Sequence, residues 1–75
     1  MNKEQQQEIG LRLKAIRERA GFSRRELSQK LGVSYAHLNM VEAGRATLSL
    51  EKFLEFLREC EVWGFEIEGL KEYYK

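Results

Sequence analysis

The side chains that could bind or react are concentrated in one stretch, residues 24–45 (RRELSQKLGVSYAHLNMVEAGR). Arginines stand at both of its ends, and a guanidinium group presents a fixed fork of donors that suits phosphate or carboxylate oxygens. Catalytic groups are scarce, because the chain has one histidine, one cysteine and no aspartate. These residues supply no catalytic triad, metal cluster or phosphate loop. We therefore expect a protein that is not an enzyme and that needs neither a metal nor a cofactor.

Length and composition indicate one small folded domain that covers residues 1–75. The hydrophobic share of 43% is that of a globular chain rather than a disordered one. No apolar run approaches the roughly 18 residues that span a membrane, and the first residues do not form a secretion signal. A single cysteine, Cys60, excludes an intrachain disulfide and fits a buried or half-buried small hydrophobe. We expect a cytoplasmic protein with no membrane partner.

Charge is distributed unevenly along the chain although its net value is only +1. Residues 1–47 carry nine lysines and arginines against five glutamates, whereas residues 48–75 carry four against seven. This asymmetry indicates either two surfaces with two different partners or a chance division of solvated charges. Charge alone does not distinguish the two.

Apolar spacing and capping residues predict helices over about residues 4–20, 24–31 and 35–43, and a further helix that begins after Ser49. The residues expected to face the core are Ile9, Leu13, Ile16, Ala20, Leu27, Leu31, Leu38, Val41, Leu50, Phe53, Leu54, Leu57 and Cys60.

The middle two helices are joined by a very short connection. Ser23 and Glu26 form a capping-box pattern at the start of the first of them, and Ser34 repeats the cap at the start of the second. Between them, Gly32 supplies the left-handed backbone of a tight turn. Two short helices joined in this way form a helix-turn-helix motif over residues 24–43, whose second helix can project while its inner side stays buried.

The chain resembles the Cro/C1-type helix-turn-helix domains of phage repressors and Xre-like bacterial regulators, from about Ile9 to Cys60. The motifs that carry the resemblance are Leu13 and Arg17, Gly21-Phe22-Ser23, Glu26-Leu27-Ser28, Leu31-Gly32-Val33-Ser34, Glu42-Ala43-Gly44-Arg45 and Leu48-Ser49-Leu50. Three residues depart from the family pattern: Ser28 replaces a usual alanine, Leu48 a frequent proline, and Met40 a frequent arginine or glutamine. The resemblance implies an all-α, lambda-repressor-like domain of four or five helices.

The resemblance also implies that the helix over residues 35–43 enters the major groove of DNA. Asn39 could pair with adenine through two hydrogen bonds, and Tyr35 and Ala36 could contact a thymine methyl group. Because Met40 replaces a polar residue, base recognition would be sparse and would depend partly on DNA shape. The expected base contacts are Ser34, Tyr35, Ala36, Asn39 and Met40.

Phosphate contacts would position the domain on the duplex. The candidates are Arg24 and Arg25 before the turn, and Arg45 and Thr47 after the second helix. His37 is either a further phosphate contact or an exposed polar residue without a partner. The resemblance assigns Arg17 and Glu42 a structural role, as an ion pair that ties the first helix to the end of the third.

The pattern changes in the segment over residues 61–75. Trp63, Phe65 and Ile67 alternate with polar or small residues, which predicts a β-strand. A lone strand is not stable, so we expect it to pair with its copy in a homodimer, with these three residues at the interface. Alternatively, the aromatic residues fold back on the helices of one chain.

The sequence therefore predicts a homodimer that binds a palindromic double-stranded DNA operator and regulates transcription, most simply as a repressor of its own promoter. Half-sites would lie about 34 Å apart. An alternative is the antitoxin of a toxin–antitoxin pair, in which the acidic C-terminal half covers a toxin protein, with or without DNA binding.

Overall fold

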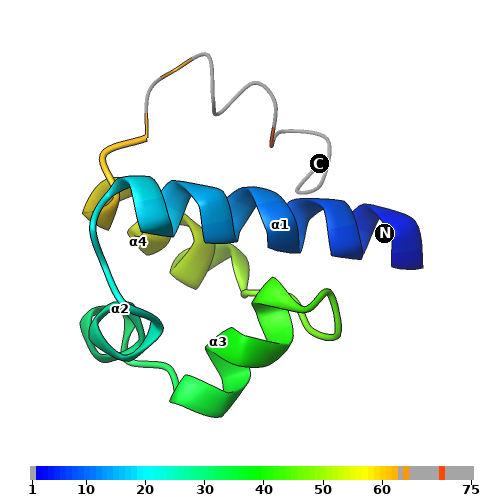
Figure 1. Ribbon diagram of the computed structural model, residues 1–75, viewed down its shortest axis with the longest axis horizontal. Coiled ribbons are helices and arrows are strands. Elements are labelled where there is room, and N and C mark those ends of the chain that lie inside the picture. Colours follow the sequence, from blue (N-terminus) through cyan, green and yellow to red (C-terminus); the bar gives the residue numbers. More distant parts are fainter. Residues whose placement is uncertain (1, 63, 65–69, 71–75) are drawn as a thin grey trace.

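The computed structural model describes residues 2–62 together with Gly64 and Leu70, and this part of the chain contains four helices. They are α1 (Lys3–Arg19), α2 (Arg24–Leu31), α3 (Tyr35–Glu42) and α4 (Leu50–Glu59). The third helix packs against α1 and α2, and α4 packs against α2. Figure 1 shows α2 and α3 on the same side of the long α1. The predicted all-α class is confirmed.

Each helix begins at a polar side chain that accepts a hydrogen bond from an amide of its first turn. The predicted capping box of α2 is present: Ser23 Oγ accepts from the Glu26 amide at 3.0 Å, and the Glu26 carboxylate accepts from the Ser23 amide. This bond from the Ser23 backbone lowers the pKa of Glu26. Ser34 and Ser49 cap α3 and α4 as predicted. An unpredicted capping box of Asn2 and Gln5 starts α1 one residue early.

The connection between α2 and α3 has the predicted left-handed turn, because Gly32 has a φ of +70°. The next amide, that of Val33, donates back to the Ser28 carbonyl at 3.1 Å. Ser28 itself is buried, and its hydroxyl donates to the Arg25 carbonyl. The turn therefore closes onto the last turn of α2 and sets the start of α3 directly after it.

The core confirms most of the predicted inward residues and corrects two of them. The confirmed residues are Ile9, Leu13, Ile16, Leu27, Leu31, Leu38, Val41, Phe53 and Cys60. Ala20 and Leu57 are partly buried against this core.

The correction concerns α4, which carries two overlapping apolar stripes. Leu50 and Leu54 were predicted to be buried, but they are 57% and 55% exposed. The buried stripe consists instead of Phe53, Phe56 and Cys60, and Phe56 was not predicted. A phenyl ring buries more apolar area than a leucine side chain, so the stripe that carries both phenylalanines faces the core.

Gly10 of α1 lies directly against the backbone at the end of α3. A methyl group at this position would lie 2.6 Å from the Val41 carbonyl oxygen and 2.7 Å from that of Glu42. Both neighbours are backbone atoms at the end of α3, so only glycine allows this separation of the two helices. The sequence pattern did not identify Gly10 as a contact residue.

The C-terminal segment is described only at a few positions. Leu70 is buried and lies beside Arg12, Ala15 and Ile16 of α1. Gly64 has a helical backbone. The other residues of the predicted strand beyond Val62 lie outside the described residues, and these include the expected interface residues Trp63, Phe65 and Ile67. Over the described part of the chain, none of the helices has the length and apolar character needed to cross a membrane.

Cys60 is a buried free thiol at the end of α4, as the sequence predicted. Burial raises the pKa of this thiol to about 11, from a usual value of 9.0. Because the folded state retains the proton to higher pH than the unfolded state, we expect stability to fall as the pH rises from about 9 to 11. Urea unfolding of the wild type and of Cys60→Ala across this range measures the effect, which should be weaker in the variant. An identical pH dependence in both proteins would contradict the expectation.

Candidate functional site

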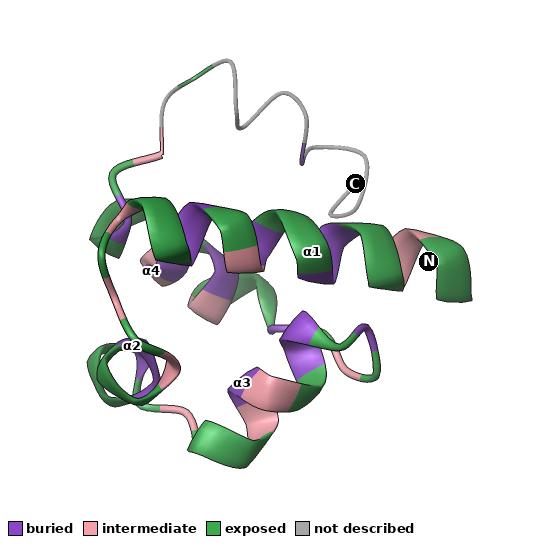
Figure 2. Cartoon of the chain, viewed as in Figure 1, coloured by how far each residue is buried: buried purple, intermediate pink, exposed green. Residues whose placement is uncertain are grey.

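The outer side of α3 is open to solvent, whereas its inner side is buried against α1 and α2. Tyr35 and Met40 are 42% and 45% exposed, and Leu38 and Val41 on the opposite side are fully buried. Ser34 and Ala36 are also exposed, and His37 and Asn39 are half-buried. Figure 2 shows that exposure increases toward the part of α3 that lies farthest from α1. The predicted base contacts therefore lie together on one accessible surface.

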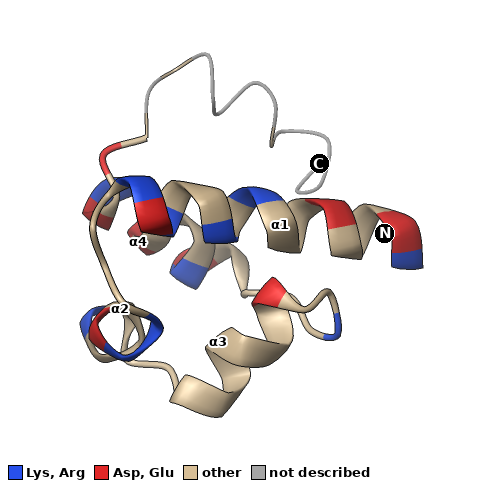
Figure 3. Ribbon diagram, viewed as in Figure 1, with Lys and Arg blue, Asp and Glu red and all other residues tan. Residues whose placement is uncertain are grey.

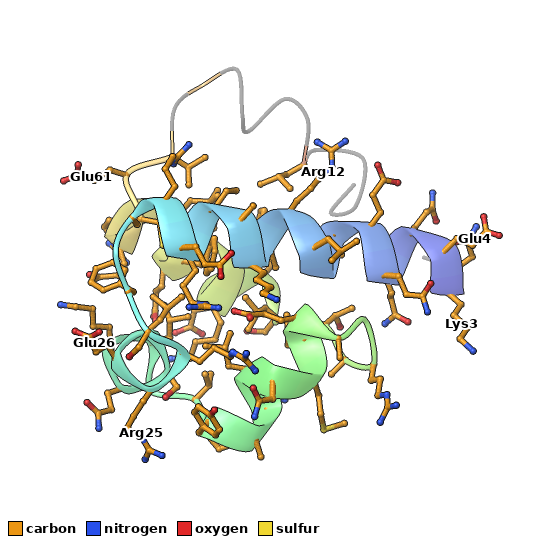
Figure 4. All side chains as sticks on the ribbon, in the orientation of Figure 1. Lys3, Glu4, Arg12, Arg25, Glu26 and Glu61 are labelled. Carbon is orange, nitrogen blue, oxygen red and sulfur yellow. The ribbon has the colours of Figure 1, made fainter. Side chains whose placement is uncertain are left out.

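Arg25 contacts this surface through a cation–π interaction. Its guanidinium carbon lies 5.1 Å from the centre of the Tyr35 ring. Figure 4 shows Arg25 extending from the side of α2 that faces away from α1. The side chain is thus an exposed cation placed directly beside the first residue of α3.

Arg24 makes two side-chain contacts that the sequence did not predict. One of its terminal nitrogens donates to Asn39 Oδ1, and its Nε lies 3.5 Å from Glu42 Oε1. The side chain remains 39% exposed. A predicted phosphate contact and a predicted base contact are therefore bonded to each other.

Arg17 and Glu42 form the ion pair that the family resemblance implied. Arg17 Nε donates to Glu42 Oε2 at 2.6 Å, and a terminal nitrogen donates to Oε1 at 3.1 Å. Arg17 also donates to the Phe22 carbonyl at 2.8 Å. Both side chains are at least nine-tenths buried, and the hydrogen bond to Glu42 raises the pKa of the arginine. This pair fixes the end of α3 to α1.

Arg45 and Thr47 are exposed in the loop that follows α3. The Arg45 amide donates to the Met40 carbonyl at 2.8 Å, which ties the start of the loop to the helix. Figure 3 shows the resulting charge pattern: α3 is uncharged until Glu42, with cationic residues on α2 and in the loop after α3. The uncharged outer side of α3 is therefore flanked by arginines on both sides.

Lys14 of α1 is a neighbouring cation that sequence reasoning did not single out. It lines a surface hollow together with Leu11, Arg24, Asn39, Glu42 and Ala43. Its spacing on α1 is that of an ordinary solvated lysine, so only the three-helix arrangement shows its position beside Arg24. Lys14 extends the cationic margin of the site onto α1.

This arrangement suits binding of a nucleic-acid duplex, whose phosphates lie on the outside and whose base edges lie in the grooves. Exposed guanidinium groups donate to phosphate oxygens, and an uncharged helix surface with an amide, a phenol and apolar groups can contact base edges. Within the described residues, no three His, Cys, Asp or Glu side chains lie close enough to hold a metal ion.

Comparison with known proteins identifies one family. The family model described as a helix-turn-helix domain matches residues 8–68, which is most of the chain. None of the curated proteins matches.

Proposed function

Because the chain belongs to the helix-turn-helix domain family, we propose that it binds double-stranded DNA through the outer side of α3 and regulates transcription. In finer detail, we assign it to the Cro/C1-type, Xre-like regulators. Such a protein acts in the cytoplasm.

The observation that carries the proposal is the uncharged, exposed side of α3, with Arg24 and Arg25 on α2 and Arg45 in the loop after α3. A helix that enters the major groove needs side chains that hydrogen-bond to base edges, while the cations belong beside the phosphates on either side. Arg25 lies against Tyr35 at the start of α3, Arg45 is exposed in the loop after α3, and Asn39 is half-buried on α3. The buried pair of Arg17 and Glu42 holds the helix in place and does not itself contact DNA.

We assign the recognition roles as follows. Asn39 contacts adenine, and Tyr35 and Ala36 contact thymine methyl groups. Additional base contacts come from Ser34 and Met40. The phosphate contacts are Arg24, Arg25, His37, Arg45 and Thr47.

We further propose that two copies bind a palindromic operator, with Trp63, Phe65 and Ile67 at the interface, and that binding represses transcription. A two-fold dimer presents two recognition helices to successive major grooves. The burial of Leu70 against α1 means that at least this part of the C-terminal segment packs within its own chain. Leu70 itself is therefore not assigned to the dimer interface. Sedimentation equilibrium of the wild type and of Trp63→Ala tests this, and a wild type that is monomeric in the presence of DNA would exclude it.

A titration of labelled duplex DNA with the protein, at several salt concentrations, tests DNA binding. Each phosphate contact releases condensed counterions, so the logarithm of the affinity should fall linearly with the logarithm of salt concentration. The double substitution Arg25→Gln/Arg45→Gln should reduce the steepness by about 2 if both residues contact phosphate. Glu51→Gln on α4 is the control, and it should leave the slope unchanged.

Folded protein that binds no duplex near physiological salt would contradict the proposal. In that case the antitoxin alternative, binding of a toxin protein through the C-terminal half, would become the better account.

A further inference from the structure

Four side chains from three helices form a continuous series of polar contacts. Arg17 of α1 pairs with Glu42 at the end of α3, Glu42 faces Arg24 at the start of α2, and Arg24 donates to Asn39. The series begins at a pair that is more than nine-tenths buried and ends on the exposed side of α3. Asn39, which is assigned to DNA recognition, is thus connected to the core through Arg24 and Glu42.

Arg24 is oriented by two partners rather than one. Its Nε lies 3.5 Å from Glu42 Oε1, and a terminal nitrogen bonds to Asn39 Oδ1. Glu42 cannot move freely, because Arg17 holds both of its carboxylate oxygens. The position of the Arg24 guanidinium is therefore set relative to the core.

The contact with Asn39 selects one orientation of its amide. Arginine has only donors, so it bonds to the amide oxygen and excludes the flipped orientation, in which the NH₂ group would face the guanidinium. The terminal torsion of an asparagine side chain is otherwise broad. A contact to the oxygen leaves its second lone pair and the NH₂ group for another partner. Adenine requires this combination, one acceptor and one donor from the same amide.

We propose that Arg24 is a positioning residue that determines base specificity by holding the Asn39 amide in the orientation that recognises adenine. This proposal rests on the DNA-binding function proposed above and replaces a role for Arg24 as a phosphate contact alone. Glu42 takes part through Arg24, in addition to its structural pairing with Arg17. A lysine at position 24 would keep the charge, but a single ammonium group lacks the fork that spans Asn39 and Glu42.

Selection from a randomised duplex pool, followed by affinity measurements on all four bases at each enriched position, tests the proposal. Asn39→Ala identifies the position that Asn39 recognises, because the preference there disappears. Arg24→Met should reduce discrimination at that same position by about tenfold. Arg45→Met, which removes an equal charge from the loop after α3, should weaken binding to all sequences alike. Thermal unfolding of each variant verifies that it is folded at the assay temperature.

Arg24→Lys separates positioning from charge. Compared with Arg24→Met, we expect Arg24→Lys to recover the overall affinity and the salt dependence of the wild type. It should not recover the preference for one base at the position that Asn39 recognises. The proposal is overturned if Arg24→Met weakens all sequences equally, or if Arg24→Lys restores wild-type specificity. Those results would leave DNA binding intact, whereas a wild type that enriches no sequence would remove both this proposal and the proposed function.

Discussion

Glu42→Gln is expected to destabilise the fold by about 3–5 kcal/mol, because it leaves the buried Arg17 guanidinium without its counter-charge. A domain of this size has a total stability of roughly 4–11 kcal/mol, so the substitution removes much of it. Urea unfolding followed by circular dichroism measures the loss. Any loss of DNA binding in this variant must therefore be compared with its folded fraction.

The double substitution Arg17→Met/Glu42→Leu provides the matched control. Replacing both members of a buried ion pair by apolar residues of similar size is often neutral, so the double variant should be more stable than Glu42→Gln. It also removes the bond from Arg17 to the Phe22 carbonyl, so full recovery is not expected. If Glu42→Gln lowers the free energy of unfolding by less than about 1 kcal/mol, the pair contributes no more than an exposed one does.

Gly10→Ala is expected to have the second large effect. The added methyl group would lie under 3 Å from two backbone carbonyl oxygens of α3, so the two helices must separate. Overpacking of this kind costs roughly 1–3 kcal/mol, and more where backbone must move. Alanine regains only about 1 kcal/mol through its higher helix propensity. We therefore expect a lower midpoint in urea.

The neighbouring substitution Leu11→Ala serves as the control for Gly10→Ala. Leu11 is 65% exposed on the same helix, so its truncation should change stability by no more than about 0.5 kcal/mol. A Gly10→Ala variant as stable as the wild type would show that α1 and α3 do not approach as closely as the structure indicates.

Features that depend on neighbours in the chain were predictable from the sequence. Ser23, Ser34 and Ser49 cap helices because each lies one residue before a helical pattern, and Gly32 marks the turn because its backbone needs a positive φ. The role of Gly10 depends on Val41 and Glu42 of α3, which are distant in the sequence, so no local pattern reveals it.

The same distinction explains the error on α4 and the unpredicted contact at the candidate site. Two apolar stripes overlap on α4, and helical spacing alone does not show that the larger Phe56 is buried and Leu54 is exposed. The sequence predicted an accessible α3 flanked by arginines. It did not predict that Arg24 bonds to Asn39, because that contact needs the angle between α2 and α3.

A map of backbone amide chemical shifts before and after addition of a duplex shows directly whether the outer side of α3 contacts DNA. It requires no knowledge of the operator sequence. We predict the largest changes over residues 23–25, 34–40 and 44–47, with little change on the exposed side of α4 around Leu54. Changes centred on α4, with α3 unaffected, would contradict this prediction.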